Sequence, residues 1–139
     1  MILRLRTNKI KKIVSPEDVF NLISPFMKRR QSIDQMKEHF FCVGLHVSSA
    51  VVFVDLISIG NLNSAIAEPR EVYRAAIKHC VNGIIIAHNH PSGNLNPSES
   101  DRKVTRKIAE SGKILGIELV DSIIISKKGF YSFKNEDEL

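Results

Sequence analysis

The sequence predicts an α/β fold in which helices cover a mixed β-sheet. Five segments rich in Val, Ile and Phe are typical of strands, and three others carry apolar residues at helical spacing. Their order along the chain, α, β, β, α, β, α, β, β, predicts both parallel and antiparallel neighbours in one sheet. The chain has 139 residues, of which 43% are hydrophobic. That is the size of one ordinary core, so we expect a single domain over residues 1–139.

The N-terminal segment, residues 1–14, is predicted to be basic and to contain a short edge strand. Apolar Ile and Leu alternate with Arg over residues 2–6. Eight of the 20 Lys and Arg residues lie within residues 1–30, so the positive excess of the chain is N-terminal. This charge could bind the phosphate backbone of a nucleic acid. A solvated strand and helix end explain it equally well, and both interpretations remain open.

The predicted core, residues 15–133, begins with a helix. Ser15 is a typical N-cap, Pro16 suits the first helical position, and acidic side chains follow in the first turn. Pro25 lacks a backbone N–H, so it predicts a kink or an early end of this helix.

Two strands and a second helix are predicted next. Residues 40–47 and 50–59 are rich in β-branched and aromatic residues, and Ser48-Ser49 between them predicts a hairpin turn. After a loop at residues 60–64, Pro69 begins a helix. The side chains of this helix that we expect to face inward are Val72, Tyr73, Ala76, Ile77 and Cys80.

An unbroken apolar run at residues 83–87 predicts a central strand that is covered on both faces. The run leads directly into His88-Asn89-His90. Since residues i and i+2 of a strand point to the same face, His88 and His90 present two imidazoles side by side. Such a pair offers two ligands to one metal ion.

A carboxylate completes the candidate site. Ser98 is predicted to cap a third helix after a polar loop, and Asp101 falls in the first turn, where the helix dipole favours an ionised carboxylate. Two neutral imidazoles and one carboxylate suit zinc and leave one tetrahedral position for water. Zinc lowers the pKa of such a water to about 7, so an open position is typical of a catalytic site.

The chain is predicted to end in a second hairpin and a tail. Residues 117–125 and 130–133 are the strands, joined through residues 127–129. Residues 134–139 are expected to form a frayed acidic tail. The third helix, which precedes this hairpin, is predicted to end near Gly112 and Gly116 and to turn three side chains toward the core: Val104, Ile108 and Leu115.

The residues around the candidate ligands resemble a known family. His88-Asn89-His90-Pro91-Ser92-Gly93, followed by Ser98-Glu99-Ser100-Asp101, is similar to the JAMM signature of the JAB/MPN metallohydrolases, in which SxxD follows HxH after about seven residues. Shorter stretches resemble the RadC-type branch of that family: Glu38-His39-Phe40 and residues 60–64, 69–72 and 116–119. The resemblance extends from about Ser15 to Phe133.

This resemblance implies the three-layer α/β/α fold of JAB/MPN domains, which is similar to that of cytidine deaminases. It also implies His88, His90 and Asp101 as the ligands of a Zn²⁺ ion, with Ser98 beside the metal-bound water.

The family uses a glutamate from an earlier segment as general acid and base. Glu38 stands where the family pattern has this residue, just before the first core strand. A carboxyl in this role must lie near the metal without binding it. Glu71 and Glu118 remain alternatives.

Two departures from the family pattern bear on function. RadC-type proteins usually carry a helix-hairpin-helix segment ahead of this domain, and we expect none within these 139 residues, so a DNA-handling role of that segment has little support. The family also tends to have Asp-His where this chain has Asp121-Ser122. Ser122 cannot replace an imidazole, so whether a contact that this histidine makes with the metal ligands exists here is left open.

Together these features predict a zinc-dependent hydrolase of the JAMM type. Metal-activated water would attack an amide or isopeptide bond of a peptide or protein, with Glu38 taking the proton and Ser98 stabilising the oxyanion. The alternative is a non-catalytic module that retains the metal site. Such a module could be a scaffold, or it could associate with DNA through the basic segment, as a DNA-repair protein does. A structural zinc normally has four protein ligands, and the motif supplies three, which favours the hydrolase.

The sequence also predicts a cytoplasmic location. No apolar run reaches the roughly 18 residues that cross a bilayer, and residues 1–12 lack the apolar core of a signal peptide. Cys42 and Cys80 are expected to be buried thiols rather than a disulfide.

Overall fold

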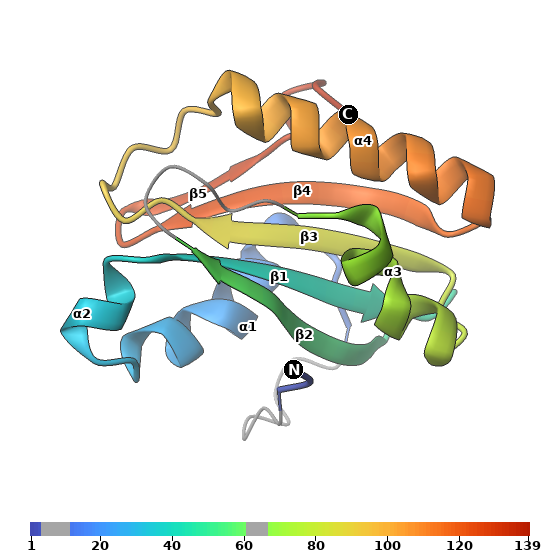
Figure 1. Cartoon of the computed structure of the whole chain (residues 1–139), viewed down its shortest axis with the longest axis horizontal. Helices are drawn as coiled ribbons and strands as arrows, with labels where there is room; N and C mark the ends of the chain where they lie inside the picture. Colours follow the sequence, from blue (N-terminus) through green and yellow to red (C-terminus); the bar gives the residue numbers. More distant parts are fainter. Residues whose placement is uncertain (4–11, 61–66) are drawn as a thin grey trace.

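The computed structural model describes residues 1–3, 12–60 and 67–139. These residues form one five-stranded sheet and the helices that cover it (Figure 1). The elements are α1 (Pro16–Lys28), α2 (Ser32–Gln35), β1 (Glu38–Leu45), β2 (Val51–Gly60), α3 (Pro69–Lys78), β3 (Gly83–Asn89), α4 (Glu99–Leu115), β4 (Glu118–Ser126) and β5 (Gly129–Ser132).

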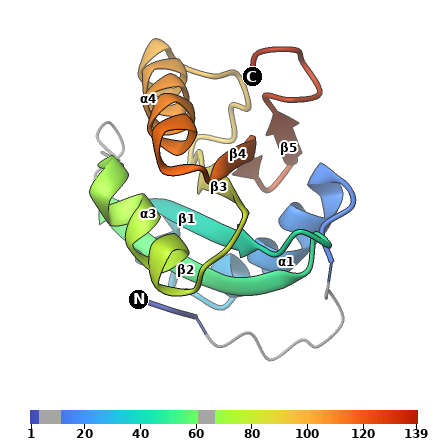
Figure 2. The same cartoon turned by 90° about the vertical axis from the view of Figure 1, so that its right-hand side faces the viewer.

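The sheet is mixed, as predicted. Its strand order is β2-β1-β3-β4-β5, with β3 parallel to β4 and the other neighbours antiparallel. The parallel pair is joined by α4, which crosses over one face of the sheet. Helices α3 and α4 cover this face and α1 covers the other, so the molecule has the three layers expected for an α/β/α fold (Figure 2).

The core consists of two apolar clusters, one on each face of the sheet. Ile84, Ile86 and the Ile108 side chain of α4 belong to one cluster, and Ile85, Ala87 and the α1 residues belong to the other. All seven residues of β3 are buried, which confirms the prediction of a central strand covered on both sides. This strand carries the candidate histidines, so a rigid element positions them.

The first helix begins at the predicted cap but does not end early. The backbone N–H of Ser15 donates to the Asp18 carboxylate at 3.0 Å, as in a capping box. The helix continues past Pro25 to Lys28, so the expectation of an early end was wrong. Packing outweighs the hydrogen bond that Pro25 removes, because the ring of Phe26 lies edge-on against Phe41 of β1 at 5.7 Å.

Other expectations about burial were wrong at helix ends. Cys42 is buried, but Cys80 is exposed because α3 ends at Lys78 and Cys80 follows it with a φ of 52°. Ile77 is also exposed, since Ala75 takes its place on the buried face of α3. Leu115 is exposed as the last residue of α4. The short helix α2 was not predicted at all.

The C-terminal tail is docked rather than frayed. The carboxylate of Glu138 accepts hydrogen bonds from Arg102 of α4 at 2.7 Å and from the hydroxyl of Tyr131 of β5 at 2.6 Å. Its backbone N–H donates to the carbonyl of Phe133 at 2.8 Å. The tail is held because Arg102, 36 residues earlier in the chain, and the nearby Tyr131 both bind Glu138.

Part of the N-terminal prediction lies outside the described residues. The backbone of Met1 and Leu3 hydrogen-bonds to Leu56 and Val54, so the start of the predicted edge strand lies beside β2. The remainder, with four basic residues at positions 4–11, is not described, and neither is most of the predicted loop at 60–64. Nucleic-acid binding by the basic segment therefore stays a prediction. Among the described residues, no helix has the length and apolar character needed to span a membrane.

Candidate metal centre

The candidate site lies at the C-terminal end of β3. His88 is the penultimate residue of β3, and His90 comes directly after the end of the strand. The backbone N–H of His90 donates to the carbonyl of Ile125 in β4 at 2.9 Å, which keeps His90 in line with the strand. Strand alternation points both imidazoles to the face covered by α4 and Asn89 to the opposite face. The structure thus places the two histidines side by side, as the spacing predicts.

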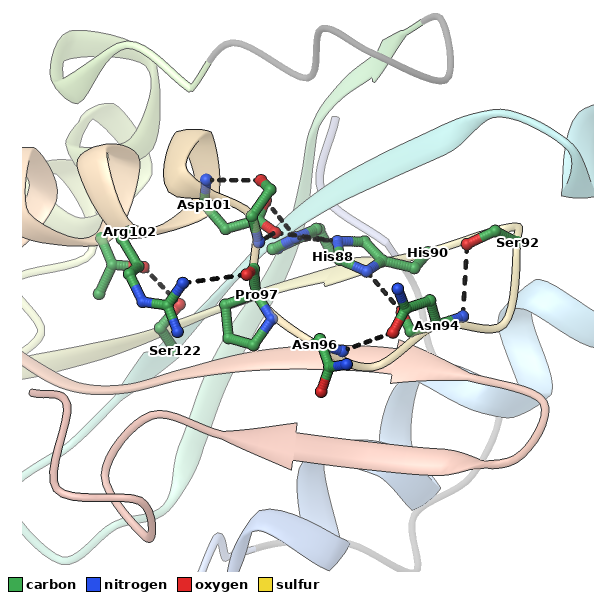
Figure 3. A network of polar contacts seen from close by, with 11 residues as sticks. His88, His90, Ser92, Asn94, Asn96, Pro97, Asp101, Arg102 and Ser122 are labelled. Carbon is green, nitrogen blue, oxygen red and sulfur yellow. Dashed lines mark hydrogen bonds and ion pairs between the residues drawn. The ribbon is translucent and has the colours of Figure 1, made fainter.

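The loop after His90 returns the chain to the same place. It turns sharply at Gly93, whose φ of 85° suits glycine, and the N–H of Gly93 donates to the carbonyl of His90 at 3.0 Å. Further hydrogen bonds join Asn96 to the side chain of Asn94 and Arg102 to the carbonyl of Pro97 (Figure 3). This network sets where α4 begins.

Helix α4 begins with a complete capping box that also holds the third candidate ligand. The hydroxyl oxygen of Ser98 accepts from the N–H of Asp101 at 3.0 Å, and the carboxylate of Asp101 accepts from the N–H of Ser98 at 2.8 Å. The cap and the candidate site therefore use the same side chain, and the cap restricts its rotation.

Two imidazole nitrogens and the carboxylate of Asp101 converge at this point. The Nε2 atoms of His88 and His90 lie 3.2 Å apart, and the two carboxylate oxygens of Asp101 lie 3.0 Å from His88 and 3.1 Å from His90. Figure 3 shows the three side chains pointing toward one another. In a tetrahedral zinc site with bonds of about 2.0–2.1 Å, ligand atoms lie about 3.3–3.4 Å apart. The group could therefore hold a metal ion with little rearrangement.

The surroundings prepare His90 and Asp101 to act as ligands. The Nδ1–H of His90 donates to the carbonyl of Asn94 at 2.7 Å, so in the neutral imidazole the lone pair is on Nε2, the atom that faces the cluster. Burial opposes ionisation of Asp101, but its hydrogen bonds with His88 and His90 outweigh this and hold its pKa well below the ordinary value. For His90, burial lowers the pKa, yet the hydrogen bonds to Asp101 and Asn94 raise it overall.

The environment of His88 is different. Its ring stacks on Phe40 at 5.9 Å, and its buried Nδ1 has no hydrogen-bond partner among the described residues. A cavity of about 10 Å³ lies beside it. Ser122 and Thr105 line this cavity and hydrogen-bond to each other at 2.9 Å. Ser122, the departure from the family pattern, thus hydrogen-bonds to Thr105 of α4 and not to the imidazole.

Glu38 is the first residue of β1, the strand next to β3. In the β1–β3 register Phe40 is opposite His88. Continuing this register by two residues places Glu38 at the level of His90, on the same face. The negative charge of Glu38 is among the influences that raise the pKa of His90. This position suits a general base, and the role itself stays a prediction.

The two alternative glutamates are placed elsewhere. Glu118 is opposite Gly83, at the other end of β3 from His88. Glu71 lies in the first turn of α3, where it forms an ion pair with Arg74.

A larger cavity, of about 450 Å³, lies at the opposite end of the strands. It is bordered by the start of α1, the end of β1, the beginnings of β3 and β4, and the segment after β5, and it contains none of the candidate ligands. Sequence reasoning missed it, because the residues that line it share no local pattern.

Comparisons with known proteins agree with this architecture. Residues 13–139 match the family described as the RadC-like JAB domain. A UPF0758 protein of Chlorobium chlorochromatii is 40% identical over 127 residues, which cover 91% of this chain and 55% of that protein. Similar proteins occur in Caldanaerobacter subterraneus (42% identity, 88% of this chain and 54% of the relative) and Methanosarcina mazei (40%, 91% and 53%).

The chain spans about half the length of the curated relatives it matches. The match covers all the elements from α1 to β5, the His-Asn-His segment and the start of α4. The chain therefore belongs to the RadC-like JAB domain family.

Proposed function

We propose that this domain is a zinc-dependent hydrolase that cleaves an amide or isopeptide bond in a peptide or protein. One observation carries the proposal: the Nε2 atoms of His88 and His90 and the carboxylate of Asp101 lie 3.0–3.2 Å from one another, close to the spacing of ligands around a tetrahedral zinc ion. Within the described residues this group has three members, the number of protein ligands typical of catalytic zinc sites.

The donor set supports zinc as the metal. His88, His90 and Asp101 offer nitrogen and oxygen ligands, which zinc accepts in catalytic sites. When bound, zinc supplies Lewis acidity, which lowers the pKa of water and polarises a substrate carbonyl. The hydrogen bond of His90 to Asn94 and the capping box around Asp101 orient these ligands before any metal binds.

Two further side chains would handle protons and charge. The carboxylate of Glu38, opposite His90, would take a proton from the attacking water and give it to the leaving nitrogen. The hydroxyl oxygen of Ser98 is occupied as a helix cap, but its hydrogen remains able to donate to the oxyanion that develops on the substrate.

The test is hydrolysis by the zinc-loaded protein of a peptide library and of lysine isopeptides. We expect Glu38→Gln to retain zinc and to lose activity by about 100-fold to 10,000-fold, as for other general bases. Glu71→Gln is the matched control, since Glu71 lies in α3, and should retain activity. Full activity of Glu38→Gln, or the absence of turnover across both substrate sets, would reject the proposal.

A further inference from the structure

Asn89, between the two histidines, connects β3 to the segment that carries Glu38. Its Oδ1 accepts a hydrogen bond from the backbone N–H of His39 at 2.6 Å, and its Nδ2 donates to the backbone carbonyl of Lys37 at 3.0 Å. Lys37 and His39 are the neighbours of Glu38 on either side. One side chain therefore holds the backbone before and after this glutamate.

The strand register explains the arrangement. The backbone pairing between β1 and β3 ends at Phe40 and His88. One residue further, His39 lies opposite Asn89. There the side-chain amide of Asn89 provides the acceptor and the donor that the backbone carbonyl and N–H of a paired strand would otherwise provide. The β1–β3 contact is thereby extended to the level of Glu38 and His90.

The contact is buried and reinforced. Asn89 and His39 are both buried, and the Nδ1–H of His39 also donates to the carbonyl of Lys37, at 2.9 Å. That carbonyl thus accepts two hydrogen bonds, which satisfies both of its lone pairs. A backbone held on both sides of a residue fixes the direction of its Cα–Cβ bond, which here determines the face to which Glu38 points.

We infer that Asn89 is a positioning residue that sets the distance between the Glu38 carboxylate and the metal centre. The requirement for asparagine follows from the geometry, because the side chain must offer an acceptor and a donor in one plane. Aspartate would retain the acceptor and lose the donor, and alanine would lose both. The catalytic consequence rests on the proposed function, but the position of Glu38 does not.

A structural readout tests the inference without activity. With Co²⁺ bound, the NMR pseudocontact shift of the Glu38 carboxyl carbon depends on its distance and direction from the metal and so reports its position. We expect Asn89→Ala to bind one Co²⁺ and to leave the shifts of the His88 ring unchanged, while the Glu38 shift becomes smaller. Amide hydrogen exchange at His39 should become about fivefold to tenfold faster, as expected for one lost hydrogen bond. The matched control is Asn82→Ala, at the opposite end of β3.

The Asn89→Asp variant gives an independent test should Asn89→Ala fold poorly. It should retain slow exchange at His39 but still reduce the Glu38 shift, because the contact with Lys37 is lost. An unchanged Glu38 shift in a folded Asn89 variant overturns the inference, whatever the activity.

Activity tests the catalytic consequence separately. A misplacement of about 1 Å can reduce turnover on the order of 100-fold, so Asn89→Ala should approach Glu38→Gln, and the double variant should be no slower than Glu38→Gln. If the parent protein hydrolyses none of the substrates, the proposed function fails, while the cobalt experiment still decides the role of Asn89.

Discussion

Ser98 and Asp101 hydrogen-bond to each other in both directions, from the Asp101 N–H to the Ser98 hydroxyl and from the Ser98 N–H to the Asp101 carboxylate. The same carboxylate lies within 3.1 Å of both candidate histidine ligands. The helix cap and the candidate metal site therefore share one side chain, so we expect a change at the cap to affect both the stability of the fold and the affinity for metal.

Ser98→Ala removes the acceptor for the N–H of Asp101. We expect the free energy of unfolding to fall by about 1 kcal/mol, which is typical of a lost N-cap, with weaker zinc binding as a second effect. Urea denaturation measures the first and competition with a chelating dye measures the second. Ser98→Asp restores a good cap acceptor and should regain the stability. A Ser98→Ala protein as stable as the parent would contradict the capping role.

Loading with zinc should stabilise the folded chain. Free zinc at about 100 times its Kd raises the free energy of unfolding by about 2.7 kcal/mol, provided that the unfolded chain does not bind it. Thermal denaturation with and without a chelator measures this effect. His88→Ala and Asp101→Ala should abolish it, whereas His46→Ala, which removes an exposed histidine, should not. An equal zinc-dependent shift in His88→Ala would reject the ligand assignment.

Gly112→Ala tests the packing of α4 against α3. A Cβ at this position would overlap the backbone carbonyl of Ile117 and the hydroxyl of Tyr73, which donates to the carbonyl of Ile108 at 2.8 Å. We expect a loss of about 3 kcal/mol, because the backbone cannot move aside without breaking these contacts. Urea denaturation measures the loss. Lys113→Ala, at an exposed neighbouring position, should change the free energy of unfolding by less than about 0.5 kcal/mol.

The docked tail should respond to acid. Hydrogen bonds from Arg102 and Tyr131 lower the pKa of Glu138, so the carboxylate is favoured in the folded state. Its contribution to stability is present above the ordinary pKa of glutamate and is lost as the pH falls through the lowered pKa. NMR titration of the Glu138 side chain should show this lowered pKa, and Arg102→Gln should raise it. An unchanged pKa in Arg102→Gln would show that the tail is not held by this pair.

Local signals in the sequence were sufficient for most elements near the site. The apolar run before His88 predicted β3, and Ser98 predicted the start of α4 at the residue where it begins. Both signals lie within a few residues of the chain. One is an unbroken apolar run, which is typical of a strand covered on both faces, and the other is a residue type that caps helices.

Expectations were wrong where contacts between separate elements decide, and where a helix ends earlier than its apolar spacing suggests. Pro25 lies within α1 because Phe26 packs on β1, and the tail is held because Arg102 and Tyr131 meet Glu138. Cys80 is exposed because α3 ends two residues earlier.

The candidate site divides in the same way. The sequence by itself determined the ligand types, since the spacing of His88 and His90 on a strand and the cap that holds Asp101 are local properties of the chain. Only the tertiary structure decided that the start of β1, with Glu38, lies beside the end of β3 and that Asn89 contacts His39, 50 positions earlier in the chain. The pairing of β1 with β3 brings them together, and no short segment encodes the register of two strands so far apart.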